Sequence, residues 1–434
     1  MKITAAGGYD AVGRNMTGVT VKGETVAIDN GIRLDTFQMY GGESHLMQKY
    51  NTKKLLDMKV IPDYHSLKNV KCQVISHGHL DHVGALPITK PTVPIISTHY
   101  TAEIAKREYK SGNYYSRDYG EYFKISKNFG VEFAEVTHSI PGASIVILKT
   151  SEGCVVYACD FRFDDHSEIA KTDYEKLKKV AREGVHALVV ETTRVSEKGK
   201  TPGESVVKEK FREVVEFTND SAGGLTVATT FSTHIERVNM ILEVIEKTGK
   251  IPIILGRSLS KHTDIAEQFG IMDLPPNARV VGTGKSMKNV LREINNKKKQ
   301  ERGDYFLLVT GNQGEPHSVL PKLVGGEFSF KFRKNDSVIF CADTIPVPIN
   351  ETNRYVLETK LESQGVKIFK NIHVSGHASK EEHRKLLNIL NPEHIIPCHG
   401  NMEMKGAYSK LAAEEGYELN KNVHLINNGL SVEI

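Results

Sequence analysis

At 434 residues the chain is too long for one ordinary hydrophobic core, so we expect two domains. Its 57 Lys and Arg against 53 Asp and Glu leave a net charge of +4, which permits a polyanionic partner but does not require one. No apolar run approaches the roughly 20 residues that span a membrane. The sequence after Met1 also lacks a signal-peptide pattern, so we expect no membrane partner.

The five cysteines indicate a reducing compartment. Their number is odd, and no two of them form a Cys-x-x-Cys pair. Four lie in apolar runs, where a free thiol behaves as a small hydrophobe: Cys72, Cys154, Cys159 and Cys341. We therefore expect a cytoplasmic protein.

Residues 1–35 predict short strands separated by glycine turns. The pair Asn30-Gly31 in particular predicts a β-hairpin. A run of short strands at the start of the chain favours a sandwich of packed sheets.

The stretch from Ser76 to His82 carries the strongest chemical signal. It follows an apolar run, Val70 to Ile75, that predicts a buried strand, and open α/β folds place their sites at the carboxyl ends of such strands. It supplies four ligand-type side chains: His77, His79, Asp81 and His82. Alternate residues of an extended chain point the same way, so the first two histidines can close on one metal ion. The aspartate and the last histidine face a second point nearby. Imidazole and carboxylate are ligands that zinc prefers.

Two later segments have open interpretations. Residues 111–123 interleave four tyrosines with Arg117, which suits either stacking on single-stranded bases or a packed connector. The basic run Lys297-Lys298-Lys299 suits either an RNA contact or a solvated turn.

Three polar residues follow predicted strands in the first half of the chain. His138 follows Val131–Thr137, Asp160 ends the apolar run from Cys154, and Glu191 ends the run from Ala187. Together with the histidine-rich stretch, His138 supplies a third imidazole for the first metal. Asp160 supplies a carboxylate that can bridge two ions.

From Gly199 to about Asn350 the chain alternates strands with amphipathic helices, which predicts a parallel α/β domain. Polar loops follow its strands, and backbone amides and hydroxyls at helix starts suit phosphate. Ordinary N-capping by Ser and Thr is the alternative explanation. One loop consists of Phe231, Ser232, Thr233 and His234.

The last segment returns to the first domain. It contains the run His373, Val374, Ser375, Gly376 and His377. A strand that ends in His399 then supplies the outer ligand that the second metal lacks.

These motifs resemble the metallo-β-lactamase superfamily, its β-CASP nucleic-acid-processing branch and, within that branch, the ribonuclease J family. The resemblance spans nearly the whole chain and rests on these segments: Gly7-Gly8, Gly13–Met16, His77–Pro87, Thr229–Phe231, Gly256–Ser258, Thr310–Pro316 and His373–His377. It implies an α/β fold in which a metallo-β-lactamase αββα sandwich carries an inserted parallel α/β β-CASP domain. We expect the first part of the sandwich at residues 1–198, the β-CASP domain at 199–351 and the return segment at 352–434.

The resemblance also implies roles for the site residues. Two Zn²⁺ ions, with Mn²⁺ as an alternative, would be held by His77, His79, His138, Asp81, His82 and His399, with Asp160 bridging. His377, oriented by Glu191, would act as the general acid, and Asp81 belongs to the catalytic group as well. Residues 231–234 and 373–377 would hold the 5′-terminal nucleotide. The expected activity is 5′→3′ exonuclease action on single-stranded, 5′-monophosphorylated RNA, with endonuclease cleavage as a minor mode.

Two departures from the family pattern are visible. Glu191 stands where the bacterial enzymes have Asp, and its longer arm should still hold His377. The chain ends soon after His399, which resembles the short archaeal form, and a homodimer is expected. The alternatives are a 3′-end-processing endoribonuclease of the cleavage and polyadenylation type and a small-molecule hydrolase of the same fold.

Overall fold

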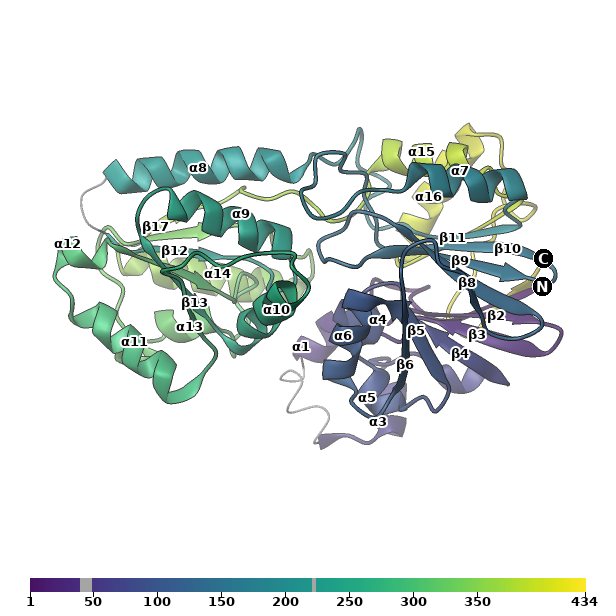
Figure 1. The fold of residues 1–434 in the computed structure, drawn as a ribbon, viewed down its shortest axis with the longest axis horizontal. Coiled ribbons are helices and arrows are strands. Elements are labelled where there is room, and N and C mark those ends of the chain that lie inside the picture. Colours follow the sequence, from purple (N-terminus) through teal and green to yellow (C-terminus); the bar gives the residue numbers. More distant parts are fainter. Residues whose placement is uncertain (40–48, 221–223) are drawn as a thin grey trace. The chain divides into compact units, whose positions relative to one another are not determined.

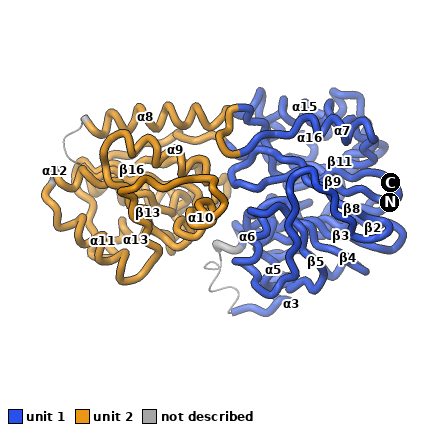
Figure 2. Tube along the Cα trace, in the orientation of Figure 1, with its two compact units in different colours: residues 1–165, 170–201, 375–434 blue, residues 166–169, 202–374 orange. Residues whose placement is uncertain are grey.

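The computed structural model describes residues 1–39, 49–220 and 224–434, and the chain divides into two compact units (Figure 1, Figure 2). Unit 1 comprises Met1–Asp165, Ala170–Thr201 and Ser375–Ile434. Unit 2 comprises His166–Ile169 and Pro202–Val374. Within the described ranges, no helix combines the length and the apolarity needed to cross a bilayer.

One sheet of unit 1 has the strand order β19-β1-β2-β3-β4-β5-β6. Its strands are β1 (Lys2–Gly7), β2 (Met16–Val21), β3 (Glu24–Ile28), β4 (Val70–Val74), β5 (Pro94–Thr98), β6 (Asn113–Arg117) and β19 (Ser431–Glu433). The strands β19, β1, β2 and β3 pair antiparallel, whereas β3 to β6 pair parallel.

The predicted hairpin at Asn30-Gly31 is wrong. Because β3 pairs with β4 in parallel, the chain must cross over between them, and it does so through α1 (Leu34–Met39) and α3 (Thr52–Asp57). Gly31 serves a close approach instead. A Cβ there would lie 1.5 Å from the backbone oxygen of Asp81, so a side chain would push this loop away from the histidine-rich stretch.

The second sheet of unit 1 has the order β18-β11-β10-β9-β8-β7. Its strands are β7 (Phe123–Lys124), β8 (Phe129–Glu135), β9 (Ser144–Thr150), β10 (Gly153–Ala158), β11 (Ala187–Glu191) and β18 (His394–Cys398). The strands β10, β11 and β18 pair parallel, and β9 pairs antiparallel with both β10 and β8. It follows that β8, β10, β11 and β18 all run in the same direction.

Alternate residues of the second sheet serve two cores. On β10, Val155 and Tyr157 pack with residues of the first sheet, whereas Val156 and Ala158 pack on the opposite face. Helices cover that opposite face: α7 (Tyr174–Glu183), α15 (Lys380–Leu390) and α16 (Met402–Glu414). Strands buried on both faces need apolar side chains at every position, which explains the unbroken apolar runs in the sequence.

The remaining helices of unit 1 complete an αββα sandwich. They are α4 (Leu80–Val83), α5 (Leu86–Thr89), α6 (His99–Glu108) and the 3₁₀ helix η1 (Tyr64–Ser66). Of these, α6 packs against β5 and β6 of the first sheet.

Unit 2 is a parallel sheet with helices on both faces. Its order is β14-β13-β15-β12-β16-β17, from β12 (Thr226–Thr229), β13 (Ile251–Leu255), β14 (Arg279–Val281), β15 (Tyr305–Val309), β16 (Ser337–Phe340) and β17 (Lys367–Phe369). One face carries α8 (Glu204–Asp220), α9 (Ile235–Glu246) and α10 (Arg257–Gln268). The other carries α11 (Gly284–Asn296), α13 (Val319–Val324) and α14 (Pro348–Ser363). Two short elements complete the unit: α12 (Lys299–Arg302) and the 3₁₀ helix η2 (Glu327–Ser329).

The units do not divide at the residues that the sequence suggested. Residues 352–374 were assigned to the return segment, but α14 extends to Ser363 and β17 pairs with β16, so this stretch belongs to unit 2. Unit 1 resumes at Ser375.

The tyrosine-rich segment contains β6, which pairs with β5 along the edge of the first sheet. Tyr114 donates its hydroxyl to the Tyr109 oxygen at 2.6 Å, and Tyr119 donates to the Ala143 oxygen at 3.2 Å. These two rings therefore serve the fold. Tyr115 and Tyr122 are more exposed, so stacking on RNA remains a prediction for them. Of the basic run, Lys297 and Lys298 precede α12, and the side chain of Lys299 lies outside the described residues.

Candidate active site and metal centre

The candidate active site of unit 1 lies where four parallel strands end. Because β8, β10, β11 and β18 share one direction, their carboxyl ends meet at one edge of the sheet. The residues at or just after these ends are His138, Asp160, Glu191 and His399. The stretch from Ser76 to His82 follows β4 of the facing sheet and meets them there.

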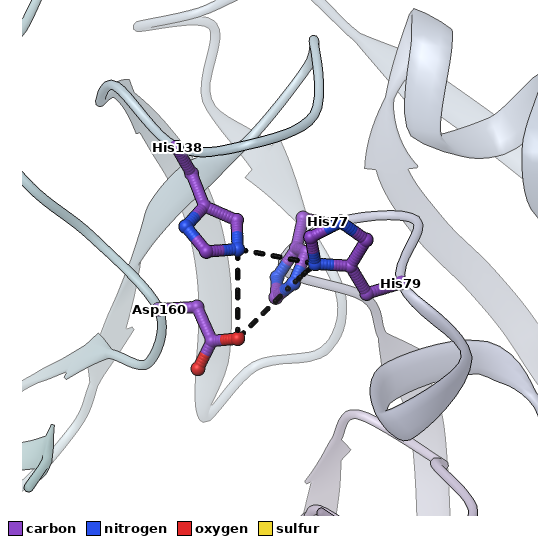
Figure 3. A group of neighbouring side chains, drawn as sticks. All are labelled: His77, His79, His138 and Asp160. Atoms are coloured by element: carbon purple, nitrogen blue, oxygen red, sulfur yellow. Dashed lines mark hydrogen bonds and ion pairs between the residues drawn. The ribbon is translucent and has the colours of Figure 1, made fainter. Parts of the chain in front are cut away.

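Three imidazoles and one carboxylate form the first metal-type group (Figure 3). His79 Nδ1 lies 3.1 Å from both His77 Nε2 and His138 Nε2. Asp160 Oδ2 lies 3.5 Å from His77 Nε2 and 3.6 Å from His138 Nε2. Ligand atoms around a tetrahedral zinc ion are about 3.3 Å apart, because each lies about 2.0–2.1 Å from the metal. The spacing therefore fits one such ion.

A second group lies on the other side of Asp160. Asp160 Oδ2 is 3.3 Å from His82 Nε2, and Asp160 Oδ1 is 3.4 Å from His399 Nε2. Asp81 Oδ2 lies 3.6 Å from His82 Nε2 and 3.8 Å from His399 Nε2. Asp160 thus contacts both groups, as a bridging ligand would. Burial alone would raise the pKa of Asp160, but His399 and His82 hold it well below its usual range.

The outward nitrogens of four of these histidines have hydrogen-bond partners. The pairs are His77 Nδ1 with Ser76 Oγ at 3.1 Å, His82 Nδ1 with Asp29 Oδ2 at 2.7 Å, His138 Nδ1 with the Gly376 oxygen at 2.7 Å, and His399 Nδ1 with Asn15 Oδ1 at 2.8 Å. A proton fixed on the outward nitrogen leaves a lone pair on the inward one. Burial also keeps the pKa of His79 and His138 well below its ordinary value, which favours neutral imidazole. The donor set therefore fits metal binding.

Asp29 supports this cluster, although no pattern in the sequence indicated it. The carboxylate is fully buried and accepts hydrogen bonds from the Ser76 amide at 2.8 Å and from Tyr157 Oη at 2.9 Å, besides its contact with His82. In the sequence it precedes Asn30-Gly31, and that pair indicated a turn rather than an orienting carboxylate.

Three non-glycine residues of the site adopt left-handed backbone conformations. Their φ angles are 61° for Asp29, 62° for Asp160 and 51° for His399. Such conformations cost free energy and persist only where the surrounding structure holds them, which is common at active sites. Each of the three follows a strand and turns its side chain into the cluster.

His377 and Glu191 form a pair beside the metal groups. His377 Nδ1 lies 2.9 Å from Glu191 Oε2, and Glu191 Oε1 accepts a 2.9 Å hydrogen bond from the Phe161 amide. The side chain of His377 is 26% exposed whereas Glu191 is fully buried, so the imidazole can reach a substrate. Its ring centroid lies 5.2 Å from that of His138 and 5.9 Å from that of His399. Burial alone would lower the pKa of His377, but the charges of Glu191 and Asp160 raise it to about 9.

The residues expected to hold the terminal nucleotide fall in both units. Ser375, Gly376 and His377 begin the last segment of unit 1, and His373 and Val374 end unit 2. In unit 1, Ser375 Oγ accepts a 3.1 Å hydrogen bond from the His377 amide.

In unit 2, the polar loop 231–234 follows β12, and Phe231, Ser232 and Thr233 are half-buried. His234 is 1% exposed, lies 3.1 Å from Glu204 and caps α9 at the Arg237 amide, so its imidazole serves the fold. Arg237 also contacts His373 Nδ1 at 2.6 Å and donates to the Val374 oxygen at 3.1 Å.

Cys159 lies against the second metal-type group, although its sequence context indicated only core packing. Its Sγ is 3.5 Å from Asp160 Oδ1. Burial raises the pKa of the Cys159 thiol well above its usual value, so the sulfur keeps its proton and donates to the carboxylate.

Comparisons with known proteins agree with this geometry. The family model for the ribonuclease J beta-CASP domain matches residues 224–358, and the model for the Zn-dependent metallo-hydrolase RNA specificity domain matches residues 366–425. The ribonuclease J of Pyrococcus abyssi is 44% identical over 447 residues, which cover 100% of this chain and 97% of the relative. The chain belongs to the ribonuclease J family.

Further relatives support the assignment. The ribonuclease J of Methanocaldococcus jannaschii is 41% identical, with 99% of this chain and 98% of the relative covered. A crystal structure of a protein of unknown function from Enterococcus faecalis superposes with a TM-score of 0.67 at 17% identity, covering 99% of both chains, which supports the fold alone. The expected αββα sandwich with an inserted β-CASP domain is confirmed, and the chain is a metal-dependent nuclease. The family assignment favours this class over the small-molecule hydrolase considered from the sequence.

Proposed function

We propose that the protein is a zinc-dependent 5′→3′ exoribonuclease that prefers single-stranded RNA carrying a 5′-monophosphate. The observation that carries the proposal is the position of the His377–Glu191 pair beside seven ligand-type side chains in unit 1. The full-length similarity to relatives named ribonuclease J supports RNA as the substrate.

Two zinc ions would occupy the two groups, with Mn²⁺ as an alternative. His77, His79 and His138 would hold one ion and Asp81, His82 and His399 the other, with Asp160 between them. Five imidazoles among seven ligands favour zinc over the hard cations Mg²⁺ and Ca²⁺. When bound, a pair of ions supplies Lewis acidity, lowering the pKa of water to about 7 and neutralising charge on the phosphate.

His377 would supply the proton for the leaving group. In the hydrolysis, water adds to phosphorus, the bond to the 3′ oxygen breaks, and that oxygen takes a proton from His377. Glu191 keeps the imidazole charged and fixes its orientation through Nδ1, so Nε2 carries the proton toward the substrate. The Phe161 amide holds the other oxygen of Glu191 and keeps the pair in place.

Ser375 and Gly376 would bind the terminal phosphate. Because Ser375 Oγ accepts from the His377 amide, its own O–H is left to donate to a phosphate oxygen. A phosphate held two residues from the general acid fixes the distance between the RNA end and the scissile bond, which favours one-nucleotide steps.

The test compares three RNAs of one sequence that carry a 5′-monophosphate, carry a 5′-triphosphate or are circular. We expect mononucleotide products mainly from the monophosphorylated RNA and none after chelation. Cleavage of the circle at internal sites with resistance of the monophosphorylated RNA would refute the exonuclease and favour an endonuclease of the cleavage and polyadenylation type. Minor circle cleavage beside rapid end degradation fits the expected secondary mode.

The homodimer and the cytoplasmic location remain predictions. Light scattering of the purified protein at two concentrations checks the first, and cell fractionation checks the second.

A further inference from the structure

A second group of histidines lies at the amino ends of β11 and β18, at the opposite edge of the sheet from the active site. His186 directly precedes β11, Glu393 directly precedes β18, and His394 is the first residue of β18. His424 follows Val423, which bridges to Ile395 of β18. All four belong to unit 1, and the family resemblance assigns none of them a role.

The side chains of this group lie within reach of one ion. His186 Nδ1 is 2.7 Å from Glu393 Oε2, and His394 Nδ1 is 3.1 Å from His424 Nε2. One ligand atom from each of His186, Glu393 and His394 lies within 4.8 Å of the others. The ring of His394 is 5.3 Å from that of His186 and 5.2 Å from that of His424, so it stands between them. Small side-chain rotations would bring four ligand atoms to the distances that zinc requires.

The backbone fixes the group. The His394 amide donates to the His186 oxygen at 3.0 Å, and the His424 amide donates to the Ile395 oxygen at 2.9 Å. Three adjacent chain segments thus present one imidazole each. Gly153 makes room for His186, because a Cβ there would lie 2.7 Å from the Cβ of His186. The group is therefore built by the sheet rather than by mobile surface chains.

Its protonation and exposure also suit a metal. Burial and the neighbouring His186 lower the pKa of His394, and burial and His394 lower that of His424, so both are neutral near pH 7. His186, His394 and His424 are half-buried and Glu393 is exposed, so an ion can enter from solvent. The simplest alternative is two separate hydrogen-bonded pairs, His186 with Glu393 and His394 with His424. Such pairs do not require the ring of His394 to lie between those of His186 and His424, as it does here.

We propose that His186, Glu393, His394 and His424 form a metal site for a divalent transition metal, with Zn²⁺ as the probe. Glu191 lies five positions after His186, and His399 lies five positions after His394, so about 16 Å of strand lies between this site and the active centre. An ion here joins three chain segments and fastens the segment around His424 to β18. Its role is structural, and it does not depend on the nuclease mechanism.

Zinc stoichiometry tests the site. The purified protein is dialysed to equilibrium against buffered micromolar Zn²⁺, and bound zinc per chain is measured by mass spectrometry. We expect the double variant His186→Ala/His424→Ala to bind one zinc fewer than the native protein. His65→Ala is the matched control, since His65 is an exposed histidine of unit 1 whose ring contacts that of Tyr64, and it should keep the native stoichiometry. Equal zinc in the native and double-variant proteins overturns the proposal, as does an equal loss in the control.

Two further measurements keep the test decisive if the double variant folds poorly. Glu393→Gln preserves shape at an exposed position and removes the proposed carboxylate ligand. Zinc binding at this site should weaken by about 10- to 100-fold or more, because losing a ligand costs at least as much as losing a supporting carboxylate. Hydrogen exchange of residues 423–425 should slow with zinc in the native protein and not in Glu393→Gln. Zinc-independent exchange in the native protein, or unaltered zinc affinity in Glu393→Gln, contradicts the site. Because neither readout uses activity, failure here leaves the nuclease proposal standing.

Discussion

The two ends of strands β11 and β18 carry the same residue types in different surroundings. At the carboxyl ends, Glu191 is 0% and His399 is 1% exposed. At the amino ends, His186 is 21% and Glu393 is 67% exposed. One sheet edge thus presents histidine and carboxylate to a closed, desolvated site, and the other presents them to water.

The difference lies in what supports the histidines. At the carboxyl edge, His82 and His399 bond outward to Asp29 and Asn15, so their inward nitrogens are fixed before any ligand arrives. At the amino edge, His394 bonds to His424 within the group. Histidines with outward partners are preorganised for chemistry, whereas histidines that bond to each other must rearrange to bind an ion. We therefore expect tighter metal binding at the carboxyl edge.

Replacing Asp160, the carboxylate shared by the two metal-type groups, should reduce activity more than any other change considered. Asp160→Ala removes the group that contacts both metal-type clusters, and we expect activity to fall on the order of 10⁴-fold because several kcal/mol of metal stabilisation are lost. Initial rates on 5′-monophosphorylated RNA measure the loss of activity, and bound zinc per chain measures the loss of metal. Asp165→Ala, an exposed aspartate that bonds Tyr174 Oη at 3.0 Å, is the matched control. Native zinc content and rate in Asp160→Ala would exclude the bridging role.

Removing the proposed general acid should reduce turnover without removing metal. His377→Ala should lower kcat by about 10²- to 10⁴-fold, the usual contribution of a positioned acid, while bound zinc stays at the native level. Loss of zinc in this variant would reassign His377 as a metal ligand.

The companion variant Glu191→Gln tests whether the charge of Glu191 raises the pKa of His377. In the proposed mechanism, activity needs protonated His377 and is therefore lost as the pH rises through the pKa of this imidazole. Removing the Glu191 charge lowers that pKa, so the alkaline limb of the pH–rate profile should move to lower pH. An unmoved limb would assign it to another group.

Replacing Asp29, the carboxylate that supports His82, should reduce activity less than replacing a proposed metal ligand. Asp29→Asn keeps the shape but weakens the hold on His82 Nδ1, and zinc affinity of the second group should fall about 10- to 100-fold. Competition with a chromophoric chelator measures it. Tyr157→Phe removes only one hydrogen bond to Asp29 and should change affinity much less. Equal effects of the two variants would indicate a general loss of packing.

The sequence predicted the ligand-type side chains that the structure brings together, but not the residues that support them. His77, His79 and Asp81 stand at short spacing, and Asp160 and His399 follow apolar runs, so local pattern was sufficient to find them. Asp29 contacts His82 across 53 positions, and no local rule links an aspartate after one strand to a histidine after another.

The same limit explains the misplaced boundary and the role of His234. An amphipathic helix such as α14 has the same periodicity in either unit, so pattern could not assign residues 352–374. His234 follows a strand end in a polar loop, and only the buried position of Glu204 shows that its imidazole supports the fold. Only contacts between residues distant in sequence, such as β16 with β17 and His234 with Glu204, resolve these two questions.

The smallest expected change is in the free energy of unfolding, and it concerns Glu132, a buried carboxylate away from both edges of the sheet. Glu132 on β8 lies 3.0 Å from Lys149 and also pairs with Lys176. Burial would raise its pKa, but the hydrogen bonds and charges of these lysines lower it below 4.5. A depressed pKa contributes stability above the unfolded-state value, and this stability is lost as the pH falls through the folded-state pKa. Glu132→Gln should therefore cost about 1 kcal/mol of unfolding free energy at pH 7 and less at pH 3, with zinc content unchanged. Urea denaturation at both pH values measures it. An equal loss of unfolding free energy at pH 7 and pH 3 would attribute the destabilisation to packing rather than to charge. A loss of zinc in Glu132→Gln would contradict the expectation that only carboxylates in contact with the clustered histidines affect metal binding.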